Sequence, residues 1–323
     1  MMSTRKTQQL TEKYAPKSLS EVVGQEEVIK RLQSMVASRT VPDMLFVGPP
    51  GCGKTTVARC LARDLGIYPV KYLELNASDE RGIETVRTKV KGFSKTLGFR
   101  LLVLDEADSV TMDAQEALRG VITPQFQSDC VFILTGNRPQ KIIEPLQSRC
   151  IPVYFKPLDE ITIASRLTEI CIAENFDISS GDAKDQLMEI IKNCKGDMRK
   201  ALLFLQTSVQ DGKIIRTLLH NDEKTGIVKI AFRKAAEGDL AGSLESIEDA
   251  VLMRMPVDEI VETLSEEISH IEDTQTKARL FIKLGDFDSR LRQGGPTVVH
   301  LGAFLSWVWV APYAAKCPML EES

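Results

Sequence analysis

The sequence lacks the features that mark several classes of protein. Its seven cysteines are odd in number and form no Cys-x-x-Cys pair, which argues against a disulfide framework and against a zinc site. The N-terminal segment MMSTRKTQQL is polar and has no apolar region of the kind found in secretory signals. The longest apolar stretch, residues 301–315, is interrupted by Ser306 and Pro312 and is too short to span a bilayer. We therefore expect a soluble intracellular protein with no membrane partner.

What the chain does have is the composition of a globular protein. Its 323 residues predict about two compact units, or three if they are small. Hydrophobic residues make up 43% and charged residues 27%, which excludes a disordered or collagen-like chain. The net charge is −4, but residues 237–273 contain twelve acidic residues and one basic residue. The remainder is therefore basic and able to bind a polyanion, although a solvated acidic helix face also explains the acidic segment.

Short apolar runs alternate with amphipathic segments from residue 20 onward. The runs predict buried strands at residues 44–48, 71–77, 100–108, 131–137 and 151–155. The segments between them predict helices at residues 26–36, 54–65, 82–95 and 114–122. Strands that alternate with helices indicate an α/β domain whose parallel sheet is covered on both faces. This domain is expected to end near Pro157.

The strand signals stop after Pro157, and the rest of the chain reads as helical. Helices are predicted at residues 159–174, 183–194 and 198–210, then at 257–271 and 298–310. The sequence contains no internal repeat and no low-complexity linker. We expect three domains: a nucleotide-binding domain over residues 1–157, a helical lid over 158–222, and a helical tail over 223–323.

A phosphate-binding motif lies between the first strand and the following helix. The segment GPPGCGKT, from Gly48 to Thr55, fits the pattern G-x-x-x-x-G-K-[ST] in its required strand-to-helix setting. Its glycines let backbone N–H groups approach phosphates, and the helix N-terminus favours negative charge. Lys54 would bind the outer phosphates of ATP, and Thr55 would hold Mg²⁺. The residues assigned to phosphate binding are Gly48, Pro49, Pro50, Gly51, Cys52, Gly53, Lys54, Thr55 and Thr56.

Polar residues at later positions complete a hydrolytic site. Asp105 and Glu106 follow the buried run LLVL, where Asp105 suits Mg²⁺ and Glu106 suits activation of the attacking water. Asn137 ends the next strand and would orient that water. Arg199 begins a lid helix, from which a cation can reach the γ-phosphate, although on sequence alone an exposed arginine at a helix start explains this residue better. Arg149 is a candidate arginine finger, and its spacing leaves open whether it serves its own site or that of a neighbour.

These motifs together resemble those of the replication factor C small subunits, which are clamp-loader AAA+ ATPases, with archaeal small subunits the most similar. The resemblance covers about 200 residues. It rests on EKY-x-P at Glu12, VVGQ at Val22, GPPGCGKTT, ELNASDERGIETVRTK, LLVLDEAD, EPLQSRC and GDMRKAL. It implies an AAA+ nucleotide-binding domain, a helical lid and a C-terminal helical collar that mediates oligomerisation.

The resemblance also assigns roles to individual residues. It implies that Arg149 acts in trans, and that Asn137 and Arg199 are the first and second sensors. The adenine pocket would be lined by Tyr14, Pro16, Val22 and Val23, with Arg199 also contacting the nucleotide. DNA phosphates would lie near Arg81, Arg87 and Lys91, although helical spacing alone equally fits a solvated face for Arg87 and Lys91.

The partners implied by the family are macromolecular. They are a large clamp-loader subunit and further small subunits in a pentameric assembly, a ring-shaped sliding clamp of the PCNA type, and primer–template DNA. The location would be cytoplasmic in an archaeon and nuclear in a eukaryote.

Three departures from the family pattern fall within these motifs. Ala15 replaces the arginine that usually follows EKY, Cys52 replaces a threonine, and Gly120 replaces a basic residue. Because Cys52 lies beside Lys54 at a helix N-terminus, we expect its thiolate to be favoured, so that it is the most alkylation-sensitive cysteine and is protected by ATP.

Two other functions fit part of the pattern. Another AAA+ DNA motor, such as a branch-migration helicase or an origin-recognition ATPase, would be expected to end in a basic winged-helix segment, against which the acidic tail argues. A scaffold subunit that binds nucleotide without turnover would not need the intact Glu106 and Arg149.

Charge reversal at Arg87 and Lys91 tests the DNA assignment. We expect Arg87→Glu and Lys91→Glu to weaken binding of all DNA sequences about equally, because phosphate contacts carry no base information. The slope of log affinity against log salt, measured by fluorescence anisotropy, should shrink by roughly one unit per lost contact. An unchanged slope combined with a lost sequence preference would contradict the assignment.

Overall fold

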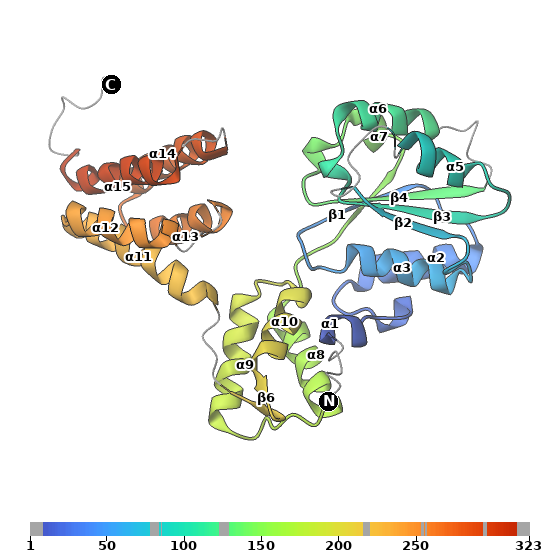
Figure 1. The fold of residues 1–323 in the computed structure, drawn as a ribbon, viewed down its shortest axis with the longest axis horizontal. Helices are drawn as coiled ribbons and strands as arrows, with labels where there is room; N and C mark the ends of the chain where they lie inside the picture. The colour runs from blue at the N-terminus through green and yellow to red at the C-terminus, as the bar shows by residue number, and fades with distance from the viewer. Residues whose placement is uncertain are drawn as a thin grey trace, which may run out of the picture. The chain divides into compact units, whose positions relative to one another are not determined.

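The computed structural model describes residues 9–77, 84, 86–122, 129–215, 220–252, 255, 257–292 and 296–314. The chain divides into two compact units, Met1–Thr217 and Leu218–Ser323. The first contains a sheet with helices and the second is built of helices (Figure 1). Each unit has hydrophobic clusters of its own.

The first unit is organised around a five-stranded parallel sheet. Its strands are β1 (Met44–Val47), β2 (Tyr72–Asn76), β3 (Arg100–Asp105), β4 (Cys130–Gly136) and β5 (Ile151–Tyr154). Their order is β2-β3-β4-β1-β5, and every neighbouring pair is parallel. Each strand overlaps one of the five apolar runs in the sequence, so the prediction of a parallel sheet is confirmed.

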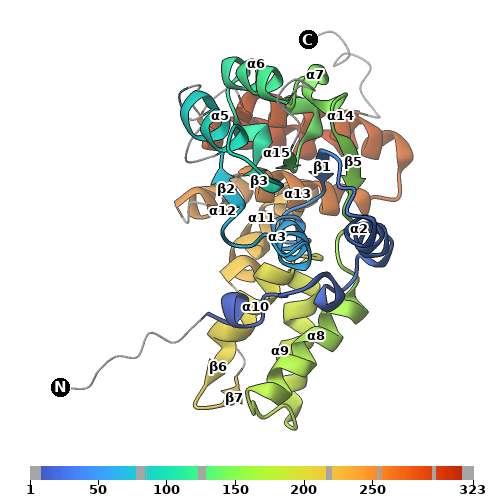
Figure 2. The same ribbon diagram turned by 90° about the vertical axis from the view of Figure 1, so that its right-hand side faces the viewer.

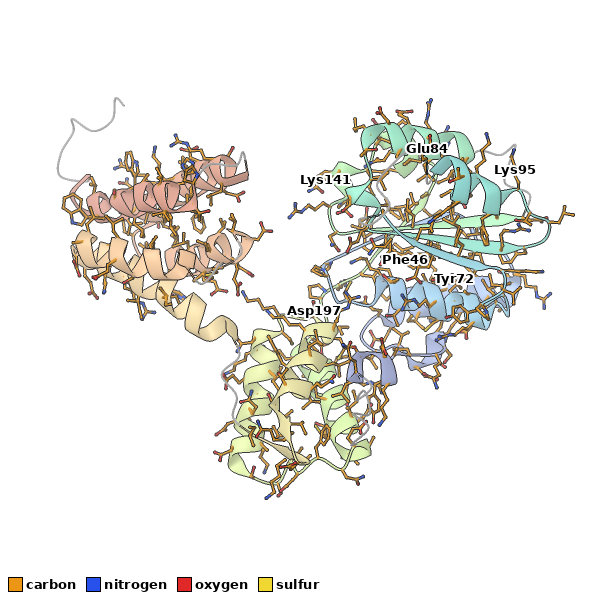
Figure 3. All side chains as sticks on the ribbon, viewed as in Figure 1. Phe46, Tyr72, Glu84, Lys95, Lys141 and Asp197 are labelled. Carbon is orange, nitrogen blue, oxygen red and sulfur yellow. The ribbon has the colours of Figure 1, made fainter. Side chains whose placement is uncertain are left out.

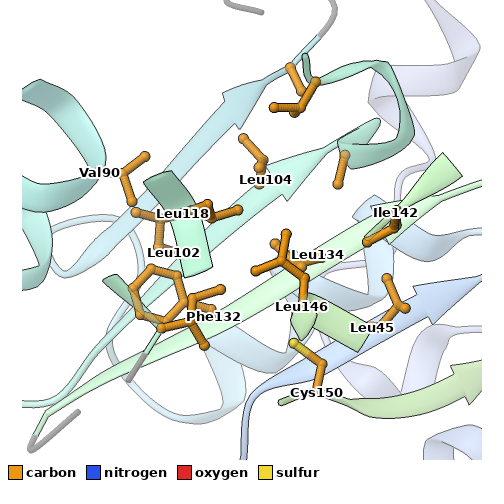
Figure 4. Packing of buried hydrophobic residues seen from close by; sticks show 14 of the residues in the cluster. Leu45, Val90, Leu102, Leu104, Leu118, Phe132, Leu134, Ile142, Leu146 and Cys150 are labelled. Atoms are coloured by element: carbon orange, nitrogen blue, oxygen red, sulfur yellow. The ribbon is translucent and has the colours of Figure 1, made fainter. Parts of the chain in front are cut away.

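Helices cover both faces of this sheet (Figure 1). One face carries α2 (Glu26–Ser38) and α3 (Lys54–Asp64), and the other carries α5 (Lys91–Ser94), α6 (Met112–Val121) and α7 (Glu144–Gln147). Alternate strand residues enter the two cores: Leu102 and Phe132 pack with Leu118 of α6 (Figure 4), whereas Val103 and Ile133 pack with Leu61 of α3. Two buried faces explain why the strands are apolar at nearly every position.

The predicted helix over residues 82–95 is described only in part. A π-helical turn spans Val86–Val90 and leads into α5. Residues 78–83 and 85 lie outside the described residues.

Three helices form the lid, and each begins at a side-chain cap. They are α8 (Glu160–Ala173), α9 (Gly181–Asn193) and α10 (Met198–Ser208). Asp159, Ser180 and Asp197 each accept a hydrogen bond from a backbone N–H of the first helical turn. Such caps satisfy donors that have no partner within the helix. The starts of α8 and α10 agree with the predicted ones to within one residue, whereas α9 begins two residues before the predicted start at 183.

The expectation that strands end at Pro157 is wrong in one place. Helix α10 stops at Ser208 rather than at residue 210, and β6 (Val209–Gln210) pairs with β7 (Lys213–Ile214) as an antiparallel hairpin. Its turn is Asp211-Gly212, and both residues have positive φ, 49° and 76°. Asp-Gly is a preferred pair for such a turn because both positions require the left-handed region. The signal was present but spans too few residues to show a strand period.

The second unit contains five helices in the part of the chain that is described. They are α11 (His220–Glu237), α12 (Leu240–Leu252), α13 (Val257–Ser269), α14 (Thr274–Arg292) and α15 (Thr297–Ala314). Their core includes Phe232, Leu264, Leu284 and Phe304, and the rings of Phe287 and Phe304 lie 5.6 Å apart. The apolar run near the C-terminus is therefore a packed core helix. Among the described helices of both units, none is long and apolar enough to cross a membrane.

Candidate functional site

The site lies where three neighbouring strands end. Val47 at the end of β1 pairs with Gly136 of β4, and Leu104 of β3 pairs with Leu134 of β4. This register delivers the phosphate loop, the Asp105-Glu106 pair and Asn137 to the same edge of the sheet. The carboxyl edge of parallel strands is where ligands of α/β sheets usually bind.

Glycine is required at particular points of the phosphate loop. Gly51 and Gly53 have φ angles of 67° and 99°, which side chains with a Cβ rarely adopt. At Gly48 a Cβ would lie 2.6 Å from the carbonyl oxygen of Phe155, so the loop can pass this backbone only without a side chain. Helix α3 begins directly after the loop, at Lys54, and its first N–H groups are available to an anion.

The Lys54 ammonium is buried and fully hydrogen-bonded. Only 8% of the residue is exposed. Its Nζ donates to the carbonyl oxygens of Gly48 (2.8 Å) and Pro49 (2.7 Å) and to Oδ1 of Asn137 (2.8 Å). Burial lowers the pKa of Lys54, because a charged amine loses hydration. An ammonium has three protons, so a phosphate oxygen must replace at least one of these oxygens.

The candidate metal ligands, Thr55 and Asp105, lie in contact. Oγ1 of Thr55 donates to Oδ1 of Asp105 at 2.8 Å, and the Thr135 hydroxyl donates to the same carboxylate oxygen. The backbone N–H of Glu106 donates to Thr135 Oγ1 at 3.1 Å. Hydroxyl and carboxylate oxygens are hard ligands of the type that Mg²⁺ prefers, so the residues present fit this ion.

Thr135 is a site residue that the sequence analysis missed. It is 1% exposed and is the one hydroxyl within the apolar run VFILTG of β4. A buried hydroxyl needs a hydrogen-bond partner, and Thr135 finds it in Asp105, which it joins to the Glu106 backbone. A polar residue in an otherwise apolar central strand was the available signal.

One cavity of about 440 Å³ brings most of the predicted residues together. Its volume lies in the range of small-molecule sites. Its lining comes from the N-terminal segment (Tyr14, Pro16, Val22, Val23), the phosphate loop and start of α3 (Pro50, Gly51, Cys52, Gly53, Lys54, Thr55, Thr56), the strand ends (Asp105, Glu106, Asn137) and the lid (Arg199). Gly48 and Pro49 do not line the cavity, but their carbonyl oxygens accept hydrogen bonds from Lys54. Arg59, Arg166 and Thr135 also line the cavity and had not been predicted.

The N-terminal wall of the cavity is tied to the lid. The Tyr14 hydroxyl donates to Oε1 of Glu174 at 2.6 Å, and Lys13 forms an ion pair with the same carboxylate at 2.5 Å. Nη2 of Arg166 donates to the Tyr14 carbonyl oxygen at 3.2 Å. Desolvation, with help from Glu174, raises the pKa of Tyr14 to about 12. The short helix α1 (Leu10–Lys13) lies against α10 (Figure 2), where the Leu10 N–H donates to Gln206.

Arg149 lies outside this cavity. It is exposed, follows α7, and its Nη1 donates to the carbonyl oxygen of Pro145 at 2.6 Å. Among the three residues assigned to DNA, Arg81 and the side chain of Arg87 lie outside the described residues, and Lys91 is exposed at the start of α5. At Gly120 a Cβ would meet nothing within 4 Å.

The expectation of a reactive Cys52 thiolate is wrong. Cys52 is 2% exposed, and its Sγ donates to the carbonyl oxygen of Pro49 at 2.9 Å. Burial raises the pKa of this thiol, and the opposing effect of Lys54 is smaller. A neighbouring lysine and a helix N-terminus favour a thiolate only where the sulfur is exposed to water or to the helix dipole. Here the loop encloses the sulfur.

Two family models match this chain. The model described as "ATPase family associated with various cellular activities" matches residues 44–158, and that of the "RCF1/5-like, AAA+ ATPase lid domain" matches residues 165–209. The replication factor C small subunit of Archaeoglobus fulgidus is 38% identical over 92% of this chain and 96% of its own length. Replication factor C small subunit 1 of Pyrobaculum islandicum is 39% identical over 91% of this chain and 92% of its own.

Among solved structures, the RuvB Holliday junction branch migration motor of Thermotoga maritima is similar in fold. It has a TM-score of 0.50 and 18% sequence identity, and the alignment covers 77% of this chain and 90% of that one. At this identity the likeness shows a shared fold.

The burial of Cys52 predicts that its thiol reacts slowly with alkylating reagents. In the native protein at about pH 8, we expect iodoacetamide to leave Cys52 unmodified, because the sulfur is enclosed and its raised pKa keeps it protonated. Peptide mass spectrometry over a time course measures this, and the same reaction in guanidinium chloride, where every thiol is accessible, is the control. Labelling of native Cys52 as fast as in guanidinium would contradict the prediction.

Proposed function

The chain belongs to the family of replication factor C small subunits, and on this basis we propose that it is an ATPase subunit of a clamp loader that helps to open a ring-shaped sliding clamp and place it on primed DNA during replication. The observation that carries the proposal is the cavity that gathers Lys54, Thr55, Asp105 and Glu106 in a chain similar to these subunits over nine-tenths of its length.

Nucleotide would bind with its phosphates on the loop and its base toward the N-terminal segment. Lys54 would exchange a carbonyl or amide oxygen for a phosphate oxygen, and the first N–H groups of α3 would add further hydrogen bonds. Tyr14, Pro16, Val22 and Val23 would enclose the adenine at the other end of the same cavity. Arg199, from the lid, would bind the γ-phosphate.

The Thr55 hydroxyl and the Asp105 carboxylate would hold Mg²⁺, which neutralises negative charge on the phosphate oxygens. The Thr55–Asp105 hydrogen bond of 2.8 Å supports a shared site for them. Glu106 would accept a proton from the attacking water. Asn137, which is hydrogen-bonded to Lys54 in this structure, would sense the γ-phosphate and orient the attacking water.

The position of Arg149 supports action in trans. It is exposed and does not line the cavity of its own chain, so its guanidinium is available to a neighbouring subunit. A positive charge that spreads over the γ-phosphoryl oxygens in the transition state is the chemistry of an arginine finger.

We propose that residues 1–157 form the nucleotide-binding domain, 158–222 the lid and 223–323 the collar that joins subunits. The partners would be a large clamp-loader subunit, further small subunits in a pentamer, a PCNA-type clamp and primer–template DNA. DNA phosphates would be contacted by Arg81, Arg87 and Lys91. Because the named relatives are archaeal proteins, a cytoplasmic location goes with this proposal.

The likeness to a branch-migration motor does not favour that function. The similarity lies in the fold at 18% identity, and in the described part of residues 220–314 every regular element is a helix, with none of the strands of a winged-helix domain. A scaffold without turnover is disfavoured by Glu106, which lies at the cavity beside Asp105.

Two substitutions separate nucleotide binding from hydrolysis. We expect Lys54→Ala to abolish ATP binding, because the cavity loses the cation aimed at the outer phosphates. Glu106→Gln should bind ATP but hydrolyse it on the order of 10²–10⁴-fold more slowly, since an amide is a poor base. Equilibrium binding and ATPase rates on the assembled complex measure both effects. A parental rate for Glu106→Gln would show that another group is the base.

A mixing experiment tests the finger. We expect assemblies of Arg149→Ala subunits to lose hydrolysis by about 10³–10⁵-fold where the finger is needed, and assemblies of Lys54→Ala subunits to lose it because they no longer bind ATP. In mixed assemblies, an intact pocket from an Arg149→Ala chain meets an intact finger from a Lys54→Ala chain, so ATPase activity should return. No rescue in assemblies shown to be mixed would place Arg149 in the site of its own chain.

A further inference from the structure

A buried glutamine connects the phosphate loop to the segment that leads into the lid. Gln25 is 5% exposed and does not line the nucleotide cavity. Its Nε2 donates to the carbonyl oxygen of Lys156 at 2.7 Å and to that of Cys52 at 3.4 Å. Its Oε1 accepts from the Lys156 N–H at 3.3 Å. Two acceptors on one side and a donor on the other determine which end of the amide is nitrogen.

The residue held by Gln25 lies at the exit from the sheet. The N–H of Phe155 still bonds to Val47 of β1 at 2.7 Å, whereas Lys156 bonds through the Gln25 side chain instead of a strand. The lid helix α8 begins four residues later, at Glu160. The Gln25 side chain takes the place of a neighbouring strand, because it satisfies the backbone N–H and C=O of Lys156. Lys156 itself is not part of the hydrogen-bond ladder of the sheet.

The lid touches the phosphate loop at a second point, the start of α10. The Met198 N–H donates to the Gly51 carbonyl oxygen at 3.3 Å, and a Cβ on Gly51 would lie 1.7 Å from Oδ1 of Asp197. Asp197 caps α10, whose first turn carries Arg199 (Figure 3 labels Asp197 on the lid). The Leu158 N–H donates to the Gly196 carbonyl oxygen at 3.1 Å, so the exit segment and the start of α10 lie side by side.

Gln25 also lies directly after residues of the N-terminal wall of the cavity. Val22 and Val23, which line the cavity, directly precede Gly24 and Gln25 in the chain. Gly24 has a φ of 72°, and a Cβ there would lie 2.5 Å from Cδ2 of Leu158. The segment therefore packs against the exit to the lid without room for a side chain at residue 24.

We propose that Gln25 is a positioning residue that couples the phosphate loop to the lid. Gln25 holds the Cys52 carbonyl and both backbone groups of Lys156, and it thereby determines where the exit segment leaves the sheet. The path of that segment in turn determines where Arg199 lies relative to the nucleotide. Gln25 acts through Arg199 and touches no nucleotide. This inference rests on the proposed ATPase function.

A double-mutant cycle on the assembled complex tests the coupling. We expect Gln25→Met to lower kcat by roughly 10–100-fold with KM changed far less, because a misplacement near 1 Å costs a catalytic group that much. On an Arg199→Ala background the same change should cost less than about twofold, since the group it positions is already absent. Multiplication of the two losses would overturn the proposal.

The matched control is another buried glutamine in the same unit. Gln186 is 0% exposed, and its Nε2 bonds within the lid to Ser208 at 3.3 Å. Gln186→Met should lower the Tm, and any effect it has on kcat should multiply with that of Arg199→Ala. If Gln186→Met reproduces the pattern of Gln25→Met, the pattern reports general destabilisation and the proposal fails.

Hydrogen exchange supplies a readout that needs no hydrolysis. In the full chain without nucleotide, Gln25→Met should speed exchange in peptides covering residues 155–158 and also residues 196–202, whereas Gln186→Met should not single out these two segments. Faster exchange at residues 155–158 alone would mean that Gln25 satisfies only local hydrogen bonds, which would overturn the coupling.

A second variant alters only one end of the amide. Gln25→Glu keeps the length of the side chain but places a carboxylate oxygen, in place of Nε2, against the carbonyls of Lys156 and Cys52, and it should give the same exchange pattern. Because the exchange experiment involves no ATP, its outcome is separate from the proposed function, which fails if the parent complex and Lys54→Ala hydrolyse ATP equally.

Discussion

The shared register of β1, β3 and β4 is the constraint on which the rest of the site depends. Because these strands are parallel and their C-terminal ends pair in register, the residues that follow each strand meet at one edge of the sheet. The phosphate loop, Asp105 and Asn137 are separated by dozens of residues in the chain, and the sheet alone makes them neighbours. A one-residue slip would turn every core side chain to the opposite face of the sheet, where it would meet a different set of helices.

The charges at that edge are satisfied within the protein. Lys54 is held by three oxygens, and Asp105 by two hydroxyls. The site is therefore preorganised, yet at least one of the Lys54 contacts must be exchanged when a phosphate enters. The amide oxygen of Asn137 is one of the three oxygens that accept a hydrogen bond from Lys54.

The lid meets the nucleotide-binding part of the first unit through several small contacts. Tyr14 and Lys13 bond to Glu174, Gln25 holds the exit from β5, and the start of α10 abuts Gly51. Tyr14 and Gly51 line the cavity, whereas Gln25 does not. These contacts are polar and lie at separate points, and the lid that they hold carries Arg199.

The sequence by itself determined the elements and most of the site. Apolar runs of four to six residues specify buried strands, and the GPPGCGKT pattern specifies its own loop because its glycines permit only a few conformations. The tertiary structure decided what depends on contacts between distant segments. Thr135 is part of the site because β4 lies beside β3, and Cys52 is a buried thiol because the loop encloses it. The Asp211-Gly212 hairpin was too short for its period to be read, and the role of Gln25 depends on Lys156, which is 131 residues away in the chain and adjacent only in the fold.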